Sequence, residues 1–284
     1  MINKTVLVTG ASSGIGYHTA VYLSKVGYTV LASVRKEEDA IKLAELGLEN
    51  LKPLWPLDLT NSKQIDEISN RIKTEIDNIE IPPLFSVINI AGGGHIVPIE
   101  LMDIADFRNE LEKRILGPVS LLQKMIPLLR KTKGRILWIA TPGLFPLPFL
   151  TDIHAPDFAV NYIARTLNIE LSPDGIRNIL IRCGGINTNS PKKSINHLKK
   201  KMDEWPSDRL ASYKNSLSKF IDEQVKFDAE RTEPTEVAKL IGKVLKVNKP
   251  KVRYQIGHLS KMGAFLEKLP QSWIDYIMEK RENK

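Results

Sequence analysis

Cysteine is scarce in this chain. Among 284 residues there is one, Cys183, which excludes an internal disulfide and any site built from several thiolates. Long apolar runs are also missing, since none approaches the roughly 18 residues needed to cross a bilayer. The opening MINKTVLVTG reads directly into a strand and does not resemble a targeting peptide. We therefore expect a cytoplasmic protein with no membrane segment, and the sequence singles out no metal site.

The composition is that of an ordinary globular protein, with 42% hydrophobic and 26% charged residues. The net charge of +8 raises the question of a nucleic-acid partner. Part of the excess lies in one stretch, PKKSINHLKKKMDEW, which has no interleaved aromatics and is typical of a solvated helix face. No nucleic-acid partner is expected.

Short apolar runs alternate with longer amphipathic segments along the first two thirds of the chain. Such alternation predicts parallel strands joined by right-handed helical crossovers, and so an α/β, Rossmann-type, doubly wound parallel sheet. We expect helices near 15–26, 37–46, 62–76, 105–129 and 149–171, and strands at TVLVT, YTVLASV, LKPLWPLD, LFSVINIA, RILWIA and RNILIRC.

The pattern changes after Thr188. We expect a single domain made of a dinucleotide-binding core (1–188), a helical substrate lid (189–233), and a last helix, last strand and C-terminal tail (234–284). The tail FLEKLPQSWIDYIMEK carries an apolar stripe, which more often packs on the protein or a partner subunit than on a membrane.

A glycine pattern, VTGASSGIG, lies between the first strand and the first helix. Gly10, Gly14 and Gly16 allow a tight turn and a close approach to a pyrophosphate, whose charge the helix N-terminus favours. The strand before it and the helix after it make the pattern specific for dinucleotide binding.

This motif, with LDLT at 57–60, NIAG at 89–92 and ELSPDGI at 170–176, resembles the short-chain dehydrogenase/reductase superfamily. The resemblance covers most of the chain up to Thr188. It implies a Rossmann-type fold, a nicotinamide cofactor, a small-molecule substrate and a homodimer or homotetramer. By this resemblance the cofactor contacts Gly10, Ser12, Ser13, Gly14, Ile15, Gly16, Asp58, Leu59, Asn89, Ala91, Gly92 and Thr188.

The end of the second predicted strand bears on the choice of cofactor. LASVRK has no acidic residue for a ribose 2′-hydroxyl, and it places Arg35 where a 2′-phosphate would lie. The sequence therefore favours NADP(H) over NAD(H). Arg35 as a solvated loop cation stays open as the alternative.

The catalytic residues usual in this superfamily are replaced. Ordinary members use a Tyr-x-x-x-Lys pair, a serine and an asparagine to protonate and hold the alkoxide that hydride transfer creates. The matching positions here carry Ile153, Asp157, Thr141 and Arg114. Tyr162 is rejected, because it would shorten the helix and give Tyr-x-x-x-Thr. A buried Asp157 requires a partner: Arg114, a ligand cation or water.

Hydride transfer to an iminium carbon gives a neutral amine and needs no tyrosine acid. Asp157 and Arg114 would then bind a cationic nitrogen and an acidic group of a bulky apolar substrate, with Asp152 as an alternative carboxylate. His95 and His154 are further candidates for a role at this site. The replacements resemble a branch of the superfamily with fungal bifunctional reductase/Diels-Alderases, which implies a coupled cycloaddition in natural-product biosynthesis. Two alternatives stay open: an NADP(H)-binding pseudoenzyme, and a non-redox cyclase or isomerase.

Overall fold

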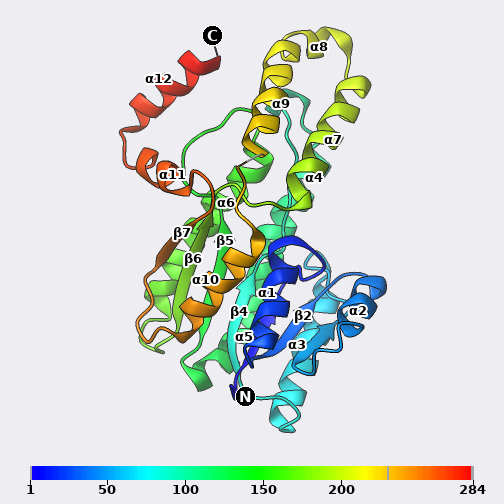
Figure 1. Ribbon diagram of the computed structural model, residues 1–284, viewed down its shortest axis with the longest axis vertical. Helices are drawn as coiled ribbons and strands as arrows, with labels where there is room; N and C mark the ends of the chain where they lie inside the picture. The colour runs from blue at the N-terminus through cyan, green and yellow to red at the C-terminus, as the bar shows by residue number, and fades with distance from the viewer. Residues whose placement is uncertain (1, 229, 283–284) are drawn as a thin grey trace.

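A seven-stranded sheet forms the centre of the protein in the computed structural model, which describes residues 2–228 and 230–282 (Figure 1). The paired strands are parallel, in the order β3-β2-β1-β4-β5-β6-β7. This confirms the doubly wound α/β fold expected from the sequence. The strands are β1 (Thr5–Val8), β2 (Thr29–Ser33), β3 (Leu51–Leu54), β4 (Leu84–Asn89), β5 (Arg135–Ala140), β6 (Arg177–Cys183) and β7 (Arg253–Ile256).

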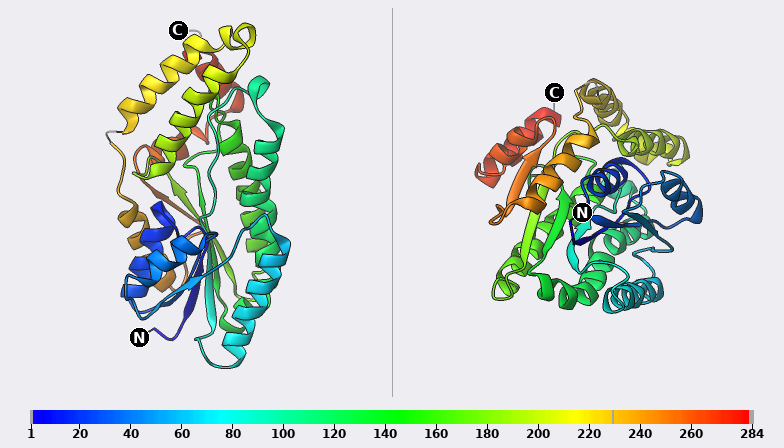
Figure 2. Two further views of the ribbon diagram at one scale, coloured as in Figure 1. Left: turned by 90° about the vertical axis from the view of Figure 1, so that its right-hand side faces the viewer. Right: turned by 60° about the horizontal axis from the view of Figure 1, so that its bottom comes forward.

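Helices cover both faces of the sheet (Figure 2). One face packs against α1 (Gly14–Lys25), α2 (Glu37–Ala44) and α10 (Pro234–Lys246), and the other against α3 (Ser62–Asp77), α5 (Gly117–Thr132) and α6 (Thr151–Glu170). Each face has its own apolar cluster, because the central strands point buried side chains in both directions.

The predicted helix over 105–129 is interrupted. The structure has α4 (Ile104–Leu111), a π-helical turn η2 (Glu112–Leu116) and then α5. Pro118 has no N–H to donate to the carbonyl of Arg114, which explains why the helix widens there. Further along, Gly117 passes so close to the chain after β3 that an added Cβ would lie 2.0 Å from the carbonyl oxygen of Leu59.

A helical layer stands above the carboxyl ends of the strands (Figure 1). It consists of α7 (Asn189–Glu204), α8 (Ser207–Ala211) and α9 (Lys214–Asp228), and we call it the lid. A small apolar cluster, which includes Ile96, Leu198 and Leu217, joins the lid to the loop after β4. The expected boundaries at 188 and 233 remain predictions, although β7 joins the last segment to the same sheet as the first.

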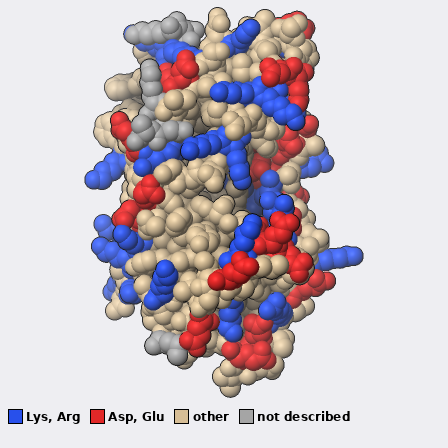
Figure 3. Space-filling model, turned by 45° about the vertical axis from the view of Figure 1, so that its right-hand side comes forward, with Lys and Arg blue, Asp and Glu red and all other residues tan. Residues whose placement is uncertain are grey.

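The chain ends in α11 (Ser260–Leu266) and α12 (Gln271–Glu282). On α12, Ile274 is buried while Trp273 and Tyr276 are exposed, so part of the predicted stripe packs on the protein. No described helix is both long and apolar enough to pass through a membrane. On the face drawn in Figure 3, basic and acidic side chains are interspersed around a band of uncharged atoms.

Candidate active site

The predicted cofactor residues come together at the carboxyl ends of the strands. Gly10 to Gly16 join β1 to α1, Asp58 and Leu59 follow β3, and Thr188 follows β6. Asn89 is the last residue of β4, and Ala91 and Gly92 continue from it. In open α/β sheets this edge is where nucleotide ligands bind.

The glycine-rich loop has the backbone that a dinucleotide site requires. Gly10 and Gly14 have positive φ angles of 67° and 54°, which side chains of L-residues rarely adopt. At Gly16 an added Cβ would lie 2.1 Å from the carbonyl oxygen of Gly10, so only glycine lets α1 start this close to the loop. Ser13 caps α1 without a side-chain hydrogen bond, and the first turn has no acidic residue. The helix N-terminus therefore presents N–H groups that suit a phosphate.

Two further observations fit a bound nucleotide. The buried Oδ1 atom of Asn89 has no hydrogen-bond partner among the described residues, while its Nδ2 donates to the carbonyl of Leu137 at 3.4 Å. Thr188 lies against the loop, 3.2 Å from where a Cβ on Gly14 would be. Ser12, Ser13 and Ile15 lie on the same loop and first turn of α1. These residues leave donors and an acceptor available for a ligand at this edge of the sheet.

The two adenosine-side candidates differ in their surroundings. Arg35 lies just beyond β2 with an exposed side chain, as expected of a residue that would contact a 2′-phosphate. The Asp58 carboxylate accepts hydrogen bonds from the N–H and hydroxyl of Thr60, each at 2.9 Å, and the backbone N–H of Asp58 donates to Gln64. The loop after β3 is thus held in place next to the predicted adenine position.

Asp157, Arg114 and Thr141 form one cluster. A guanidinium N–H of Arg114 donates to Oδ1 of Asp157, and the backbone N–H of Thr141 donates to Oδ2 at 3.0 Å. The Asp157 side chain is 2% exposed and that of Arg114 is 12% exposed. The structure therefore gives Asp157 the partner that its burial requires, and both of its oxygens are occupied within the protein.

Arg114 also fixes the start of α6 against the loop after β4. Its Nη1 donates to the carbonyl of Ile153 at 2.6 Å and to that of Gly93 at 3.4 Å. The stem of the same side chain packs on Gly92, and Ile153 packs on Gly94, where an added Cβ would lie 2.5 Å from its Cγ1. At the two positions that the sequence matches to the tyrosine and lysine, the structure thus has an apolar side chain, Ile153, and one member of an ion pair, Asp157. Tyr162, with 74% of its surface exposed, lies away from this cluster.

Asp152 and His95 form a second pair. Oδ2 of Asp152 accepts from the backbone N–H of His95 at 2.7 Å and lies 3.0 Å from its ring Nδ1. The hydrogen bond to Asp152 raises the pKa of His95, and burial opposes this rise. Oδ1 of Asp152 is buried and has no partner among the residues that the structure describes. This free oxygen makes Asp152 a carboxylate with spare bonding capacity.

His154 and Cys183 have environments that suppress their reactive forms. Burial lowers the pKa of His154, which keeps its ring neutral. Burial, with a smaller contribution from Asp157, raises the pKa of Cys183 to about 12. A packing role explains both side chains.

A pocket of about 340 Å³ lies between the lid and the loop after β4. Its size is within the range of small-molecule sites. Asp152 and His95 contribute to its wall, together with Ile96, Val97, Glu100, Leu101, Met102, Asp103, Asp106, His197, Lys201, Glu204, Trp205, Pro206 and Arg209. Glu100 is engaged by Arg209 and Tyr213, and these contacts connect the lid to the core.

Comparison with known proteins places this chain in a family. The short chain dehydrogenase family matches residues 4–199, and the chain belongs to it. A 3-amino-tetrahydro-pyrrolizinone reductase from Xenorhabdus hominickii is 29% identical over 259 residues, covering 90% of this chain and 88% of the relative.

Solved structures support the fold. A short-chain dehydrogenase from Streptomyces avermitilis has a TM-score of 0.77 at 19% identity, covering 99% of this chain and 98% of that one. A Burkholderia cenocepacia short chain dehydrogenase in complex with NADP has a TM-score of 0.73 at 20% identity, covering 98% and 99%. The protein is thus an oxidoreductase-family member with a Rossmann-type domain.

Sequence reasoning did not find the neighbours of His95. His197 on α7 and Asp106 on α4 lie beside it in the folded protein. In the sequence, Asp106 is 11 positions from His95, and His197 is 91 positions from Asp106 and 102 from His95. His197 stands within the lysine-rich stretch, which indicates a solvated helix. No spacing in the sequence connects these three positions.

Proposed function

We propose that this protein is an NADPH-dependent reductase that transfers hydride to an iminium or cyclic imine of a bulky, largely apolar substrate. The observation that carries the proposal is the buried Arg114–Asp157 pair, at positions that the sequence resemblance matches to the usual catalytic asparagine and lysine. An ion pair with both carboxylate oxygens bonded provides no acid for an alkoxide. A substrate whose product is a neutral amine does not need one.

NADPH, when bound, supplies the hydride. Gly10, Gly14 and Gly16 would admit its pyrophosphate and Arg35 its 2′-phosphate, as the backbone geometry and the exposed guanidinium support. The NADP complex of the Burkholderia cenocepacia relative supports the same cofactor.

Among the candidate carboxylates, we infer that Asp152 faces the cationic nitrogen. Asp157 has both oxygens occupied, whereas Oδ1 of Asp152 is unpartnered and the residue borders the pocket. Oδ2 of Asp152 is hydrogen-bonded by His95, and these bonds fix the direction in which Oδ1 points. A preorganised anion stabilises an iminium more than a neutral imine. The role of the Arg114–Asp157–Thr141 cluster is then structural: its hydrogen bonds hold α6 in a fixed position relative to the loop after β5.

The Xenorhabdus hominickii relative supports this substrate class, because its name denotes the reduction of an amino-substituted pyrrolizinone. A coupled cycloaddition in natural-product biosynthesis is a finer proposal, supported by the size of the pocket and its apolar residues such as Ile96, Val97 and Leu101. A cytoplasmic homodimer or homotetramer is the proposed form. Three exposed apolar side chains on α6, Phe158, Tyr162 and Ile169, support an interface there.

The test is NADPH oxidation, followed by absorbance at 340 nm, with cyclic imines and with matched ketones. Imines should be reduced and ketones should not. Asp152→Asn should lower kcat at least tenfold while NADPH affinity is unchanged, which corresponds to about 1.4 kcal/mol of lost transition-state stabilisation. Asp103→Asn is the control, since it removes a charge from the same pocket and preserves an oxygen for the cap of α4.

Rapid ketone reduction by the wild-type protein would contradict the proposal. NADPH binding without turnover of any imine would favour the pseudoenzyme. Product formation without NADPH consumption would favour a cyclase.

A further inference from the structure

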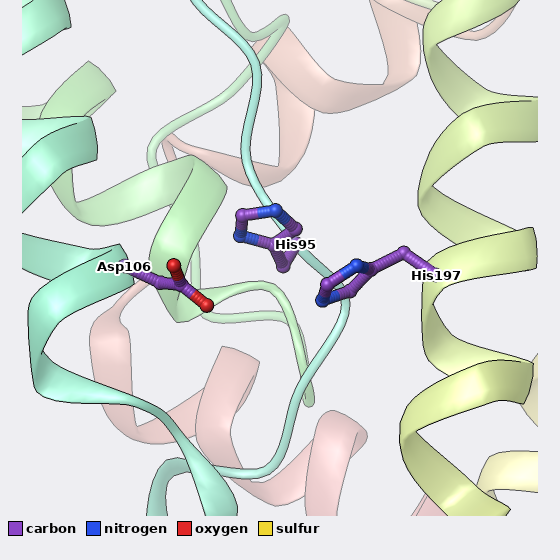
Figure 4. A group of neighbouring side chains, drawn as sticks. All are labelled: His95, Asp106 and His197. Atoms are coloured by element: carbon purple, nitrogen blue, oxygen red, sulfur yellow. The ribbon is translucent and has the colours of Figure 1, made fainter.

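Three side chains from separate elements converge on one space beside the pocket. His95 comes from the loop after β4, Asp106 from α4 and His197 from the lid helix α7 (Figure 4). One potential ligand atom from each lies within 4.8 Å of the other two. The two imidazole rings are 4.3 Å apart between centroids and tilted by 36°.

We propose that His95, Asp106 and His197 bind a divalent transition-metal ion, Zn²⁺ by preference. Two imidazole nitrogens and one carboxylate oxygen form a ligand set that Zn²⁺ accepts, with a fourth position left for water or a substrate donor. The pocket that all three residues border provides room for that fourth ligand. The sequence alone indicated no metal site, because His95, Asp106 and His197 lie in three different elements.

The spacing requires only a small closure. Zn²⁺ bonds of about 2.0–2.1 Å in a tetrahedron place ligand atoms about 3.3 Å apart. The present separations of up to 4.8 Å therefore have to shorten by about 1.5 Å at most. Changes in side-chain torsion achieve this, since all three residues are only partly buried.

An independent observation comes from behind His95. Its Nδ1 is 3.0 Å from Asp152, whose side chain is 1% exposed, so Nε2 is left to face the cluster. Histidine ligands of metals commonly donate their second ring N–H to a carboxylate in this way, which fixes the tautomer and the ring orientation. The second oxygen of the buried Asp152 has no partner among the described residues, and Asp152 is one of the residues that line the same pocket.

The charges around the cluster also suit a cation. Asp106 contributes a negative charge near both imidazoles, with one ligand atom from each of the three side chains within 4.8 Å of the others. Lys201, the nearby cation, is paired with Glu204 at 3.0 Å. A bound ion would connect α7 to α4 and to the loop after β4, so its expected effect is to hold the lid closed over the pocket.

The experiment is a calorimetric titration of Zn²⁺ into the untagged full-length chain. We expect one saturable site per chain in the wild type. His197→Gln and Asp106→Asn should each weaken it at least tenfold, and Asp152→Ala should weaken it by about 10–100-fold through loss of the hydrogen bond to His95. His258→Gln is the matched control. His258 also lies next to a carboxylate, with its Nε2 3.3 Å from Glu230, but it is outside the proposed metal site.

Two readouts separate this site from adventitious binding. Co²⁺ should give visible absorption bands of tetrahedral intensity in the wild type and in His258→Gln, and these bands should be lost in His197→Gln. Zn²⁺ should slow hydrogen exchange of the α7 amides in the wild type and in His258→Gln, and should leave it unchanged in His197→Gln. Circular dichroism checks that each variant is folded.

Unchanged Zn²⁺ affinity in His197→Gln and Asp106→Asn, or no saturable binding by the wild type, would overturn the proposal. None of these measurements depends on reductase activity.

Discussion

The Arg114–Asp157 pair provides the most direct energetic test of the site. Replacing Arg114 with Met leaves the Asp157 carboxylate, 2% exposed, without its cation. Removing one partner of a buried ion pair costs about 3–5 kcal/mol, because a charge then remains buried and unpaired. An unfolding entropy of about 2.1 cal/mol/K per residue gives about 0.6 kcal/mol/K for this chain of 284 residues. The melting temperature should therefore fall by about 5–8 °C.

The double variant Arg114→Met/Asp157→Asn removes both charges and keeps an oxygen to accept from the N–H of Thr141. It should recover most of the loss, since no buried charge is left. Differential scanning calorimetry on the two single variants and the double variant measures the coupling. Glu75→Gln, in the exposed pair with Arg71, is the control and should change the melting temperature by about 1 °C or less. A decrease below 2 °C in Arg114→Met, or equal losses in the single and double variants, would refute the assigned pairing.

Three other predictions concern the cofactor edge and the thiol. Gly16→Ala should abolish NADPH binding measured by fluorescence, because its methyl group would lie 2.1 Å from the Gly10 carbonyl oxygen. Gly47→Ala is the control for general destabilisation: it meets nothing within 4 Å but strains a left-handed φ of 63° in the turn after α2, and it should leave NADPH binding intact. Arg35→Ala should weaken NADPH at least tenfold and leave NADH unchanged, and equal losses for both would contradict the 2′-phosphate contact. Cys183, with a pKa near 12, should react with a thiol reagent at pH 8 only after unfolding, so rapid labelling of the native protein would be inconsistent with its burial.

The fold and the cofactor edge could be predicted from the sequence because their signals are local. Buried parallel strands are short apolar runs, and the turn from β1 into α1 requires glycine at fixed positions such as Gly10 and Gly16. The Arg114–Asp157 contact was one of three alternatives that the cost of a buried carboxylate left open. The structure selects it, because η2 and α6 bring the two side chains together.

Other parts of the site depend on tertiary placement. The bond between His95 and Asp152 joins residues 57 positions apart, and no periodicity indicates it. The cluster with His197 depends on where the lid helix packs. The interruption of the long helix at η2 was missed because apolar spacing does not register one extra residue in a turn.

The π-helical turn η2 has a consequence for the direction of the Arg114 side chain. A π-turn contains one residue more than an α-turn, and a single inserted codon is enough to create it. Each residue rotates a helix by about 100°, so that insertion would have swung the side chain at position 114 by more than a quarter of a circle relative to α5. In the present turn the guanidinium contacts the carboxylate on α6, and deletion of one residue from Glu112–Leu116 is expected to rotate it out of that contact while the apolar contacts of α5 stay in place.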